Sequence, residues 1–439
     1  MGYWDRRTLR GAEYFRSLPG LFARHRACQM RRVYIDVHDV EPRQKPRQKR
    51  RMQREEELRF QEQVRRQMQR FDRAAFRGPI VLQLSLGTTA KNPPHAHSIA
   101  KNLLDLLSKP FPELGSRHSL LYLDDQQIHG LAVRCHHRQE KASIGITVAP
   151  LSCFLSDLDL AVKAERNDSP DRGRDPIDVD MSVESLRRLL KNEAVYRERQ
   201  GDAWYEAMRD FSLFDVQHAV LTDSQVTLQD LAALYLRSDP QHPSLGHLWR
   251  DLHAQMREMF RKSYLRIHLD ELPQQSGRSQ DYLRHVDEQV ERFRARLGWM
   301  LQPLRVPVAL QVIVKPPPPE RANGLYDLDN VARTYIIPRV VEVFAPPTDI
   351  AWTIDIERLR ASNPDSAAHW ESLQAQLPKT SRTGLTRFEV WRVPADEEPG
   401  FVSAALVADI EELPGPFMRI DSAIDALRQR EDSRRDREW

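Results

Sequence analysis

The chain has 439 residues, enough for two or three domains, and its formal net charge at pH 7 is only +3. A charge so close to neutral gives no overall reason to expect a nucleic-acid partner, and no apolar run approaches the length of a membrane span. The three cysteines, Cys28, Cys135 and Cys153, have no CxxC spacing and predict no disulfide framework, and no signal-peptide core opens the chain. We therefore expect a soluble cytoplasmic protein.

A first α/β unit is predicted over residues 31–155, after a basic and aromatic arm at 1–30. Period-2 alternation and short apolar runs indicate strands, and 3.6-residue spacing of apolar positions indicates helices. The expected elements are, in chain order, a strand at 33–37, a long helix at about 51–76, a strand at 79–86, a helix at 99–107 and strands at 128–134 and 143–149.

Basic charge is concentrated between residues 43 and 54, where there is no acidic residue. Such a run is often a solvated segment, but it is also typical of a patch that contacts phosphates. Glutamates in the helix that follows can pair with its arginines at i,i+4, which explains part of the basic character there. As the DNA-contacting set we predict Arg43, Lys45, Arg47, Lys49, Arg50, Arg51 and Arg54.

The remainder of the chain divides into a linker, a helical insertion, a second α/β unit and a tail. The linker at 156–181 is rich in Pro, Asp and Arg, and the insertion at 182–261 has the pattern of three or four helices. In the second unit, 262–412, we expect strands at 264–272, 307–314, 387–393 and 401–408 and helices at 279–297 and 331–344. The chain ends in a charged tail at 413–439, and its part after residue 428, which charged residues dominate, is predicted to be disordered.

The two units share their element order and parts of their sequence. The strands that begin at Pro79 and Pro307 both read Pro-x-x-Leu-Gln, and residues 35–40 parallel residues 267–272. Agreement of order, spacing and local sequence indicates an internal duplication. We predict a mixed α/β (α+β) protein of two βαβαββ domains in tandem, separated by an all-helical insertion.

A possible metal site lies at Asp327-Leu328-Asp329-Asn330, where a helix follows a strand and a proline-rich loop. Two carboxylates one residue apart can share Mg²⁺, which prefers oxygen ligands, although Asp329 could equally be a helix cap. In the first unit the corresponding positions are His95, His97 and Ser98. These histidines with Asp124 or Asp125 could bind a transition metal, but we favour positions that no longer serve a metal.

The succession of strand, long basic helix, strand, Asp-x-Asp-Asn at a helix start and Asp-Asp before a strand resembles the RusA-type Holliday junction resolvases. The resemblance covers both α/β units and implies a homodimeric, Mg²⁺-dependent endonuclease that cuts branched DNA. The first carboxylates of the family motif match Asp327 and Asp329, with Asn330 beside them, whereas His95 and His97 are the degenerate positions.

The remaining family positions are divided between the units. The family's lysine one turn later matches Lys101 in the first unit and is Arg333 in the second, and the family's later Asp pair matches Asp124-Asp125 in the first unit and Ser381-Arg382 in the second. Each unit thus retains what the other has lost.

Three arrangements follow from this division. The units could pack as an internal pseudo-dimer and pool Asp327, Asp329, Asp124 and Asp125; the second unit could recruit its own third acid, such as Asp349 or Asp355; or both sites could be inactive. Carboxylates that converge to within about 5 Å would favour a metal site.

We expect the pseudo-dimer, with further dimerisation left open, to be a structure-specific endodeoxyribonuclease of DNA recombination and repair. The expected partner is branched DNA and the expected ion is Mg²⁺, or alternatively Mn²⁺, held by Asp327, Asp329 and Asp125. Asp124 and Lys101 would complete the catalytic set, and Asn330 and Arg333 would support it. The alternative is an inactive DNA-binding or scaffold protein on the same fold.

Overall fold

The structure is a computed structural model of the whole chain, and most of the chain can be described in it. No helix in the described residues is both long and apolar enough to cross a membrane. The described residues are 14, 17–45, 51–90, 93–115, 119–166, 176–235, 265–272, 279–318, 327–348, 350, 355–362, 364, 367–368, 370–372, 382–395, 397, 399–409 and 415–437.

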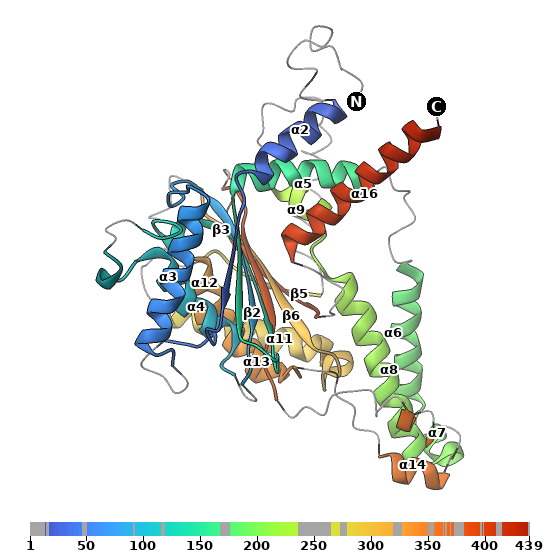
Figure 1. The fold of residues 1–439 in the computed structure, drawn as a ribbon. Coiled ribbons are helices and arrows are strands. Elements are labelled where there is room, and N and C mark those ends of the chain that lie inside the picture. Colours follow the sequence, from blue (N-terminus) through green and yellow to red (C-terminus); the bar gives the residue numbers. More distant parts are fainter. Residues whose placement is uncertain are drawn as a thin grey trace.

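A single mixed sheet of eight strands forms the centre of the molecule, in the order β1-β4-β2-β3-β7-β6-β8-β5 (Figure 1). The predicted α/β class is therefore confirmed. Strands β6, β7 and β8 are buried along their whole length, whereas β1 alternates between buried and exposed residues because one of its faces is open to solvent. The strands are β1 (Val33–His38), β2 (Ile80–Gly87), β3 (Ile128–His136), β4 (Ser143–Pro150), β5 (Arg266–Leu269), β6 (Val308–Lys315), β7 (Arg387–Arg392) and β8 (Phe401–Ala408).

The sheet consists of two halves with the same topology. β2 pairs parallel with β3 and antiparallel with β4, and β6 pairs in the same way with β7 and β8. Gln83 lies opposite Ala132 in the first half, and Gln311 lies opposite Glu389 in the second. Ala132 and Glu389 also pair with each other where β3 and β7 join antiparallel. An approximate two-fold axis therefore passes between these two residues, and the two predicted units share one continuous sheet.

The helices that follow β1, β2, β5 and β6 pack with the sheet into the larger hydrophobic core. The helix that begins at the Asp327–Asn330 motif is called here the second motif helix, and α4 is the first. The second motif helix contains a π-helical segment that ends at Ile336, two residues before Pro338, which lacks the backbone N–H that a regular helix needs. Helix α3 is shorter than the predicted 51–76, since Asp72, just after its C-terminal end, adopts a left-handed conformation with φ of 49°. The helices are α3 (Arg54–Arg70), α4 (Ala96–Ser108), α11 (Gln280–Leu301), and α12 (Leu328–Asn330) with η6 (Val331–Ile336) and α13 (Ile337–Phe344).

A second core lies among α2 (Leu18–Gln29), α5 (Leu151–Arg166), α9 (Leu228–Tyr235) and α16 (Pro416–Arg437), seen at the upper right of Figure 1. Two predictions are wrong here. Most of the proposed linker is helical, because α5 runs to Arg166 and α6 begins at Pro176. The stretch after residue 428, predicted to be disordered, continues α16 to Arg437. The helix is anchored in this core by apolar residues at three- and four-residue spacing in its first part: Phe417, Ile420, Ile424 and Leu427.

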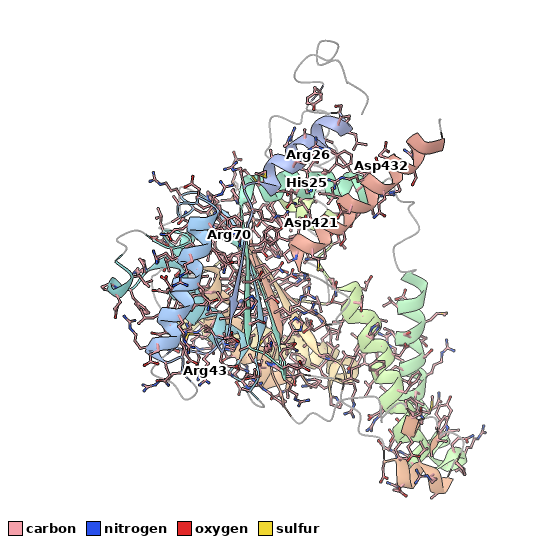
Figure 2. The ribbon with its side chains drawn as sticks, viewed as in Figure 1. His25, Arg26, Arg43, Arg70, Asp421 and Asp432 are labelled. Carbon is pink, nitrogen blue, oxygen red and sulfur yellow. The ribbon has the colours of Figure 1, made fainter. Side chains whose placement is uncertain are left out.

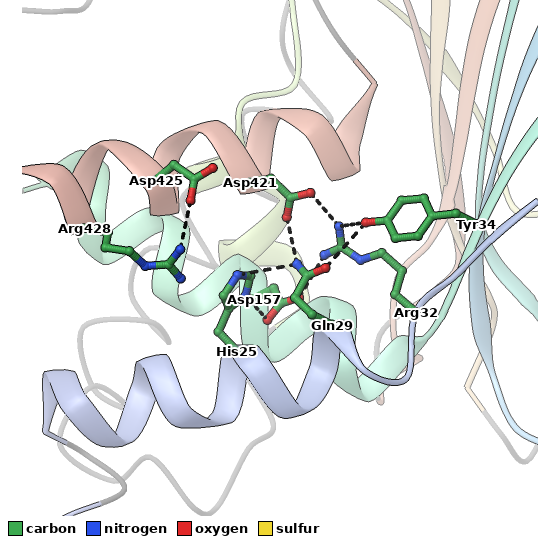
Figure 3. A network of polar contacts seen from close by, with 8 residues as sticks. All are labelled: His25, Gln29, Arg32, Tyr34, Asp157, Asp421, Asp425 and Arg428. Atoms are coloured by element: carbon green, nitrogen blue, oxygen red, sulfur yellow. Dashed lines mark hydrogen bonds and ion pairs between the residues drawn. The ribbon is translucent and has the colours of Figure 1, made fainter. Parts of the chain in front are cut away.

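Buried ion pairs join α2, α5 and α16. Asp157 accepts from His25 Nδ1 at 2.9 Å and from Arg32 Nη2 at 3.0 Å, and Arg32 Nη1 donates to Asp421 Oδ2 at 2.6 Å (Figure 3). The part of the N-terminal arm from residue 17 onward thus belongs to the second core.

The predicted helical insertion is helical where it is described, up to residue 235. Its helices α6 (Pro176–Lys191), α7 (Glu193–Gln200) and α8 (Asp202–Asp223) extend away from the sheet, and α14 (Ile356–Ser362) packs against α8 at their far end (Figure 1).

Candidate metal centre

Asp327 and Asp329 lie at the start of the second motif helix. Asp327 is the N-cap residue of α12, and its carbonyl accepts from the backbone N–H groups of Asn330 and Val331 at 3.0 and 3.2 Å. Asp is a favoured N-cap residue because its side-chain oxygen can accept a hydrogen bond from a free backbone N–H of the first helical turn. Here the Asp327 side chain does not cap the helix. Its carboxylate is therefore available for another role.

Asp125 reaches the same place from the first half of the molecule. It begins a 3₁₀ turn, Asp125–Gln127, that leads directly into β3. Because β3 and β7 are neighbours at the centre of the sheet, the start of β3 lies beside the second motif helix. The sheet therefore brings an acid from one half to two acids of the other.

The three aspartates form a compact acidic cluster. One carboxylate oxygen from each of Asp125, Asp327 and Asp329 lies within 4.8 Å of the other two. Asp329 is only 4% exposed, and the other two are half-buried. Mg²⁺ binds oxygens at about 2.1 Å, so octahedral ligands lie up to about 4.2 Å apart. A small inward movement would let these three residues share such an ion.

Lys101, from α4 of the first half, contacts the cluster directly. Its Nζ lies 3.1 Å from Asp125 Oδ2, 3.2 Å from Asp329 Oδ2 and 3.3 Å from Asp105 Oδ1. Burial alone would lower the pKa of Lys101, but the three carboxylates outweigh burial and raise it. Lys101 is therefore a permanent cation that balances part of the negative charge.

One lysine does not satisfy the whole cluster. Burial raises the pKa of Asp329, an effect that Lys101 opposes and Asp125 strengthens. Burial also raises the pKa of Asp327, and the nearby charge of Asp125 raises it further. Asp329 Oδ2 is buried and, despite its closeness to Lys101, receives no well-directed hydrogen bond. A buried acceptor without such a bond is costly. The residues present therefore fit a hard divalent cation.

Two further groups shape the cluster. Asn330 Nδ2 donates to Asp327 Oδ2 at 3.0 Å and orients that carboxylate. Arg392, at the end of β7, is 3% exposed, and its charge acts on Asp327; burial lowers its pKa to about 10. Arg392 and Asp105 were missed from the sequence. The sequence signal for Arg392 was its place within an apolar strand, and the signal for Asp105 was its spacing of four residues after Lys101.

Other predicted acids lie elsewhere. The exposed Asp124 accepts from the Gln126 N–H at 2.9 Å, so it caps the turn and does not join the three aspartates. Asp355 accepts from the Arg358 N–H at 3.1 Å and caps α14 on the helical arm, so it is not a substitute ligand. Asp349 and Ser381 lie outside the described residues.

The positions equivalent to the acidic cluster carry imidazoles and guanidinium groups. His95 and His97 stack with ring centroids 5.5 Å apart, and Arg382 Nη2 donates to the Pro93 carbonyl at 2.5 Å. Burial and then Arg382 lower the pKa of His95, while burial, His95 and Arg333 lower that of His97 to about 3. In the described part of the chain His95 and His97 do not join Asp124 or Asp125 in a group with metal-ligand geometry, whereas the three aspartates form such a group.

The predicted basic segment begins beside α4. The Arg43 carbonyl accepts from Asn102 Nδ2 at 3.0 Å, one residue after Lys101, and Lys45 forms an ion pair with Asp105. Figure 2 shows Arg43 near the foot of α3, far from His25 and Asp421. Arg51 is exposed, and Arg54 pairs with Glu113 at 2.7 Å. Arg47, Lys49 and Arg50 lie outside the described residues.

Compared with known proteins, the chain matches no family model and no curated relative. A functional inference therefore depends on the geometry of the acidic cluster and on the residues around it.

Proposed function

We propose that the protein is a divalent-metal-dependent endodeoxyribonuclease of the RusA type that acts on branched DNA. The observation that carries the proposal is the convergence of Asp125, Asp327 and Asp329 beside Lys101, with acids contributed by both halves. In this proposal the three aspartates correspond to the family's carboxylate set, distributed over a fused chain. Pooling across the two-fold axis restores a full set that neither half has alone.

Each residue has a distinct role in this proposal. Asp125, Asp327 and Asp329 would hold Mg²⁺ or Mn²⁺, which when bound activates water and stabilises charge that develops on phosphate. Asn330 keeps the Asp327 carboxylate oriented. Lys101 keeps its proton and offsets negative charge on the scissile phosphate as a point charge.

The surroundings favour DNA as the partner. The basic segment that starts at Arg43 is anchored next to Lys101 on α4, so phosphate contacts would continue from the acidic cluster along the backbone. A two-fold arrangement of the halves also suits a branched substrate with approximate two-fold symmetry. The predicted role in recombination and repair follows from that substrate.

We expect a nick rather than paired cuts, because the equivalent positions in the other half carry His95, His97 and Arg382 instead of acids. The full-length protein would be incubated with a supercoiled plasmid that extrudes a cruciform, with Mg²⁺, with Mn²⁺ or with EDTA. The expected product with metal is the nicked circle. Linear product from paired cuts by a demonstrated monomer would contradict the single-site mechanism.

The same assay separates the proposal from an inactive DNA-binding protein. Cleavage should require the metal and disappear in Asp329→Asn, whereas Asp124→Asn is the matched control that changes a neighbouring acid outside the cluster. Junction binding without any metal-dependent cleavage, in protein shown to be folded, would favour the inactive alternative.

A further inference from the structure

We propose that the cluster of His95, His97, Arg333 and Arg382, called here the counterpart site, binds a backbone phosphate of the DNA without cleaving it. This inference rests on the proposed function, because it assigns a role in DNA binding to the second of two equivalent positions. The ligand is a phosphodiester, and free phosphate is the other source of the same chemistry.

The strand pairing shows that the two sites are equivalent. Asp125 lies seven residues before Ala132, and Arg382 lies seven residues before Glu389, the residue that pairs with Ala132 across the axis. His95 is the N-cap residue of α4, as Asp327 is of α12. The counterpart site therefore occupies the same part of the fold as the acidic cluster.

Positions two and six residues after each N-cap residue complete the correspondence. His97 follows its N-cap residue by two positions, as Asp329 does, and Arg333 follows Asp327 by six, as Lys101 follows His95. Three carboxylates and a lysine in one site are thus replaced by two imidazoles and two guanidinium groups in the other. A site with that composition repels a metal cation and attracts an anion.

The contacts in the counterpart site cross between the halves. Arg382 of the second half donates to the Pro93 carbonyl, two residues before His95. A Cβ added to Gly384 would lie only 3.1 Å from His95 Nδ1, so the imidazole lies directly over that glycine. Arg382 and Gly384 therefore approach the start of α4 as Asp125 approaches the start of α12.

The available donors suit a phosphate. Arginine presents a planar set of N–H groups that matches phosphate oxygens, and a neutral imidazole still offers one N–H donor. The lowered pKa of His97 is consistent with a neutral ring that donates without adding charge. The first turn of α4 contains no acidic residue, and its N-terminal end adds a favourable field for an anion. The DNA would thus be bound through a phosphate at the counterpart site and cut at the acidic cluster.

The test is metal-free binding of a fluorescent four-way junction to the full-length protein in EDTA, measured over a series of salt concentrations. The variant is Arg333→Gln with Arg382→Gln, and the control is Arg187→Gln with Arg188→Gln, two exposed arginines of α6 on the helical arm. We expect the slope of log K against log salt to fall by about 1 in the first variant only, because the loss of one phosphate contact removes about 0.9.

Arg382 also holds the Pro93 carbonyl, so its loss could alter the fold. His95→Gln with His97→Gln leaves both arginines in place, and a circular dichroism spectrum and melting curve are compared for every variant. We expect the histidine variant to bind the junction about threefold to tenfold more weakly. An unchanged affinity in the histidine variant together with an unchanged salt slope in the arginine variant would overturn the proposal.

The two proposals fail in distinguishable ways. If the wild type never cleaves but the arginine variant loses salt dependence, the counterpart site stands and the nuclease does not. If the wild type cleaves while the salt slope of the arginine variant and the affinity of the histidine variant are both unchanged, the nuclease stands and the counterpart site does not. Calorimetry with inorganic phosphate distinguishes a DNA phosphodiester from free phosphate as the ligand. If the arginine variant loses phosphate binding but binds the junction as the wild type does, the site binds free phosphate and its role on DNA is overturned.

Discussion

The acidic cluster and the counterpart site occupy equivalent positions on either side of a two-fold axis, yet they have opposite charge. Both are built at the start of a motif helix and completed by a turn from the other half, Asp125 in one case and Arg382 in the other. In a homodimer any substitution would change both sites at once. In one fused chain the two sites can diverge, so one can retain metal chemistry while the other takes a different role.

The comparison also shows why each site needs both halves. β3 and β7 are the central strands, and the turns that precede them lie next to the motif helix of the opposite half. Without the first half, Asp327 and Asp329 would lack Asp125 and Lys101. Activity is thus expected of the complete chain and not of either unit alone.

The largest expected effect comes from breaking the acidic cluster. Replacing Asp329 with Asn should lower the cleavage rate by about 10³-fold, equivalent to about 4 kcal/mol, because it removes a ligand of the proposed metal. Junction binding in EDTA should stay within about threefold, since phosphate contacts carry most of the affinity. The rate is measured on a labelled junction under single-turnover conditions. Asp124→Asn should retain the wild-type rate within about twofold; an equal loss in both variants would argue against the cluster as the cleavage site.

A second prediction makes the two sites alike. A chain carrying His95→Asp, His97→Asp, Arg333→Lys and Arg382→Asp would place the acidic set at both positions. We expect paired cuts, seen as linear plasmid, where the wild type produces nicked circles. The triple variant that retains Arg382 is the matched control, and it should still nick because its second site lacks the third carboxylate. Nicking alone by the folded quadruple variant would show that equivalence of position is not sufficient.

The smallest expected effect is on stability, and its sign follows from the raised pKa of Asp329. The folded state holds this proton more tightly than the unfolded state, whose Asp pKa is about 3.9, so stability falls as pH rises above about 4 through the raised folded pKa. Asp329→Asn removes that cost and should raise the free energy of unfolding at pH 7, a gain that disappears below about pH 4.

Urea unfolding at pH 3.5 and pH 7 in EDTA measures this gain, and the exposed Asp425, which pairs with Arg428 at 3.3 Å, provides the control variant Asp425→Asn. Mg²⁺ should stabilise the wild type and not Asp329→Asn, because a ligand stabilises only the state that binds it. Destabilisation by Asp329→Asn at neutral pH would mean that Lys101 alone satisfies the carboxylate.

Local pattern was sufficient for much of the fold. Alternation and apolar runs identified all eight strands to within a few residues, because burial on a sheet imposes its period on the chain. The predicted correspondence of Pro79 with Pro307, and of residues 35–40 with 267–272, agrees with the strand registers. Asp327 and Asp329 were also identified, since one helix start places both.

Long-range packing decided the rest. The charged stretch after residue 428 reads as a disordered tail, but it continues α16, whose earlier apolar residues pack into the second core. The sequence does not distinguish Asp124 from Asp125. In the folded chain the turn into β3 directs Asp125 toward the acids of the other half, whereas Asp124 caps that turn. Periodicity reports how a segment is buried and carries no information about which distant segment buries it. The motif at Asp327 was readable from the chain alone, and its partners Asp125 and Lys101 were selected by the junction of β3 with β7.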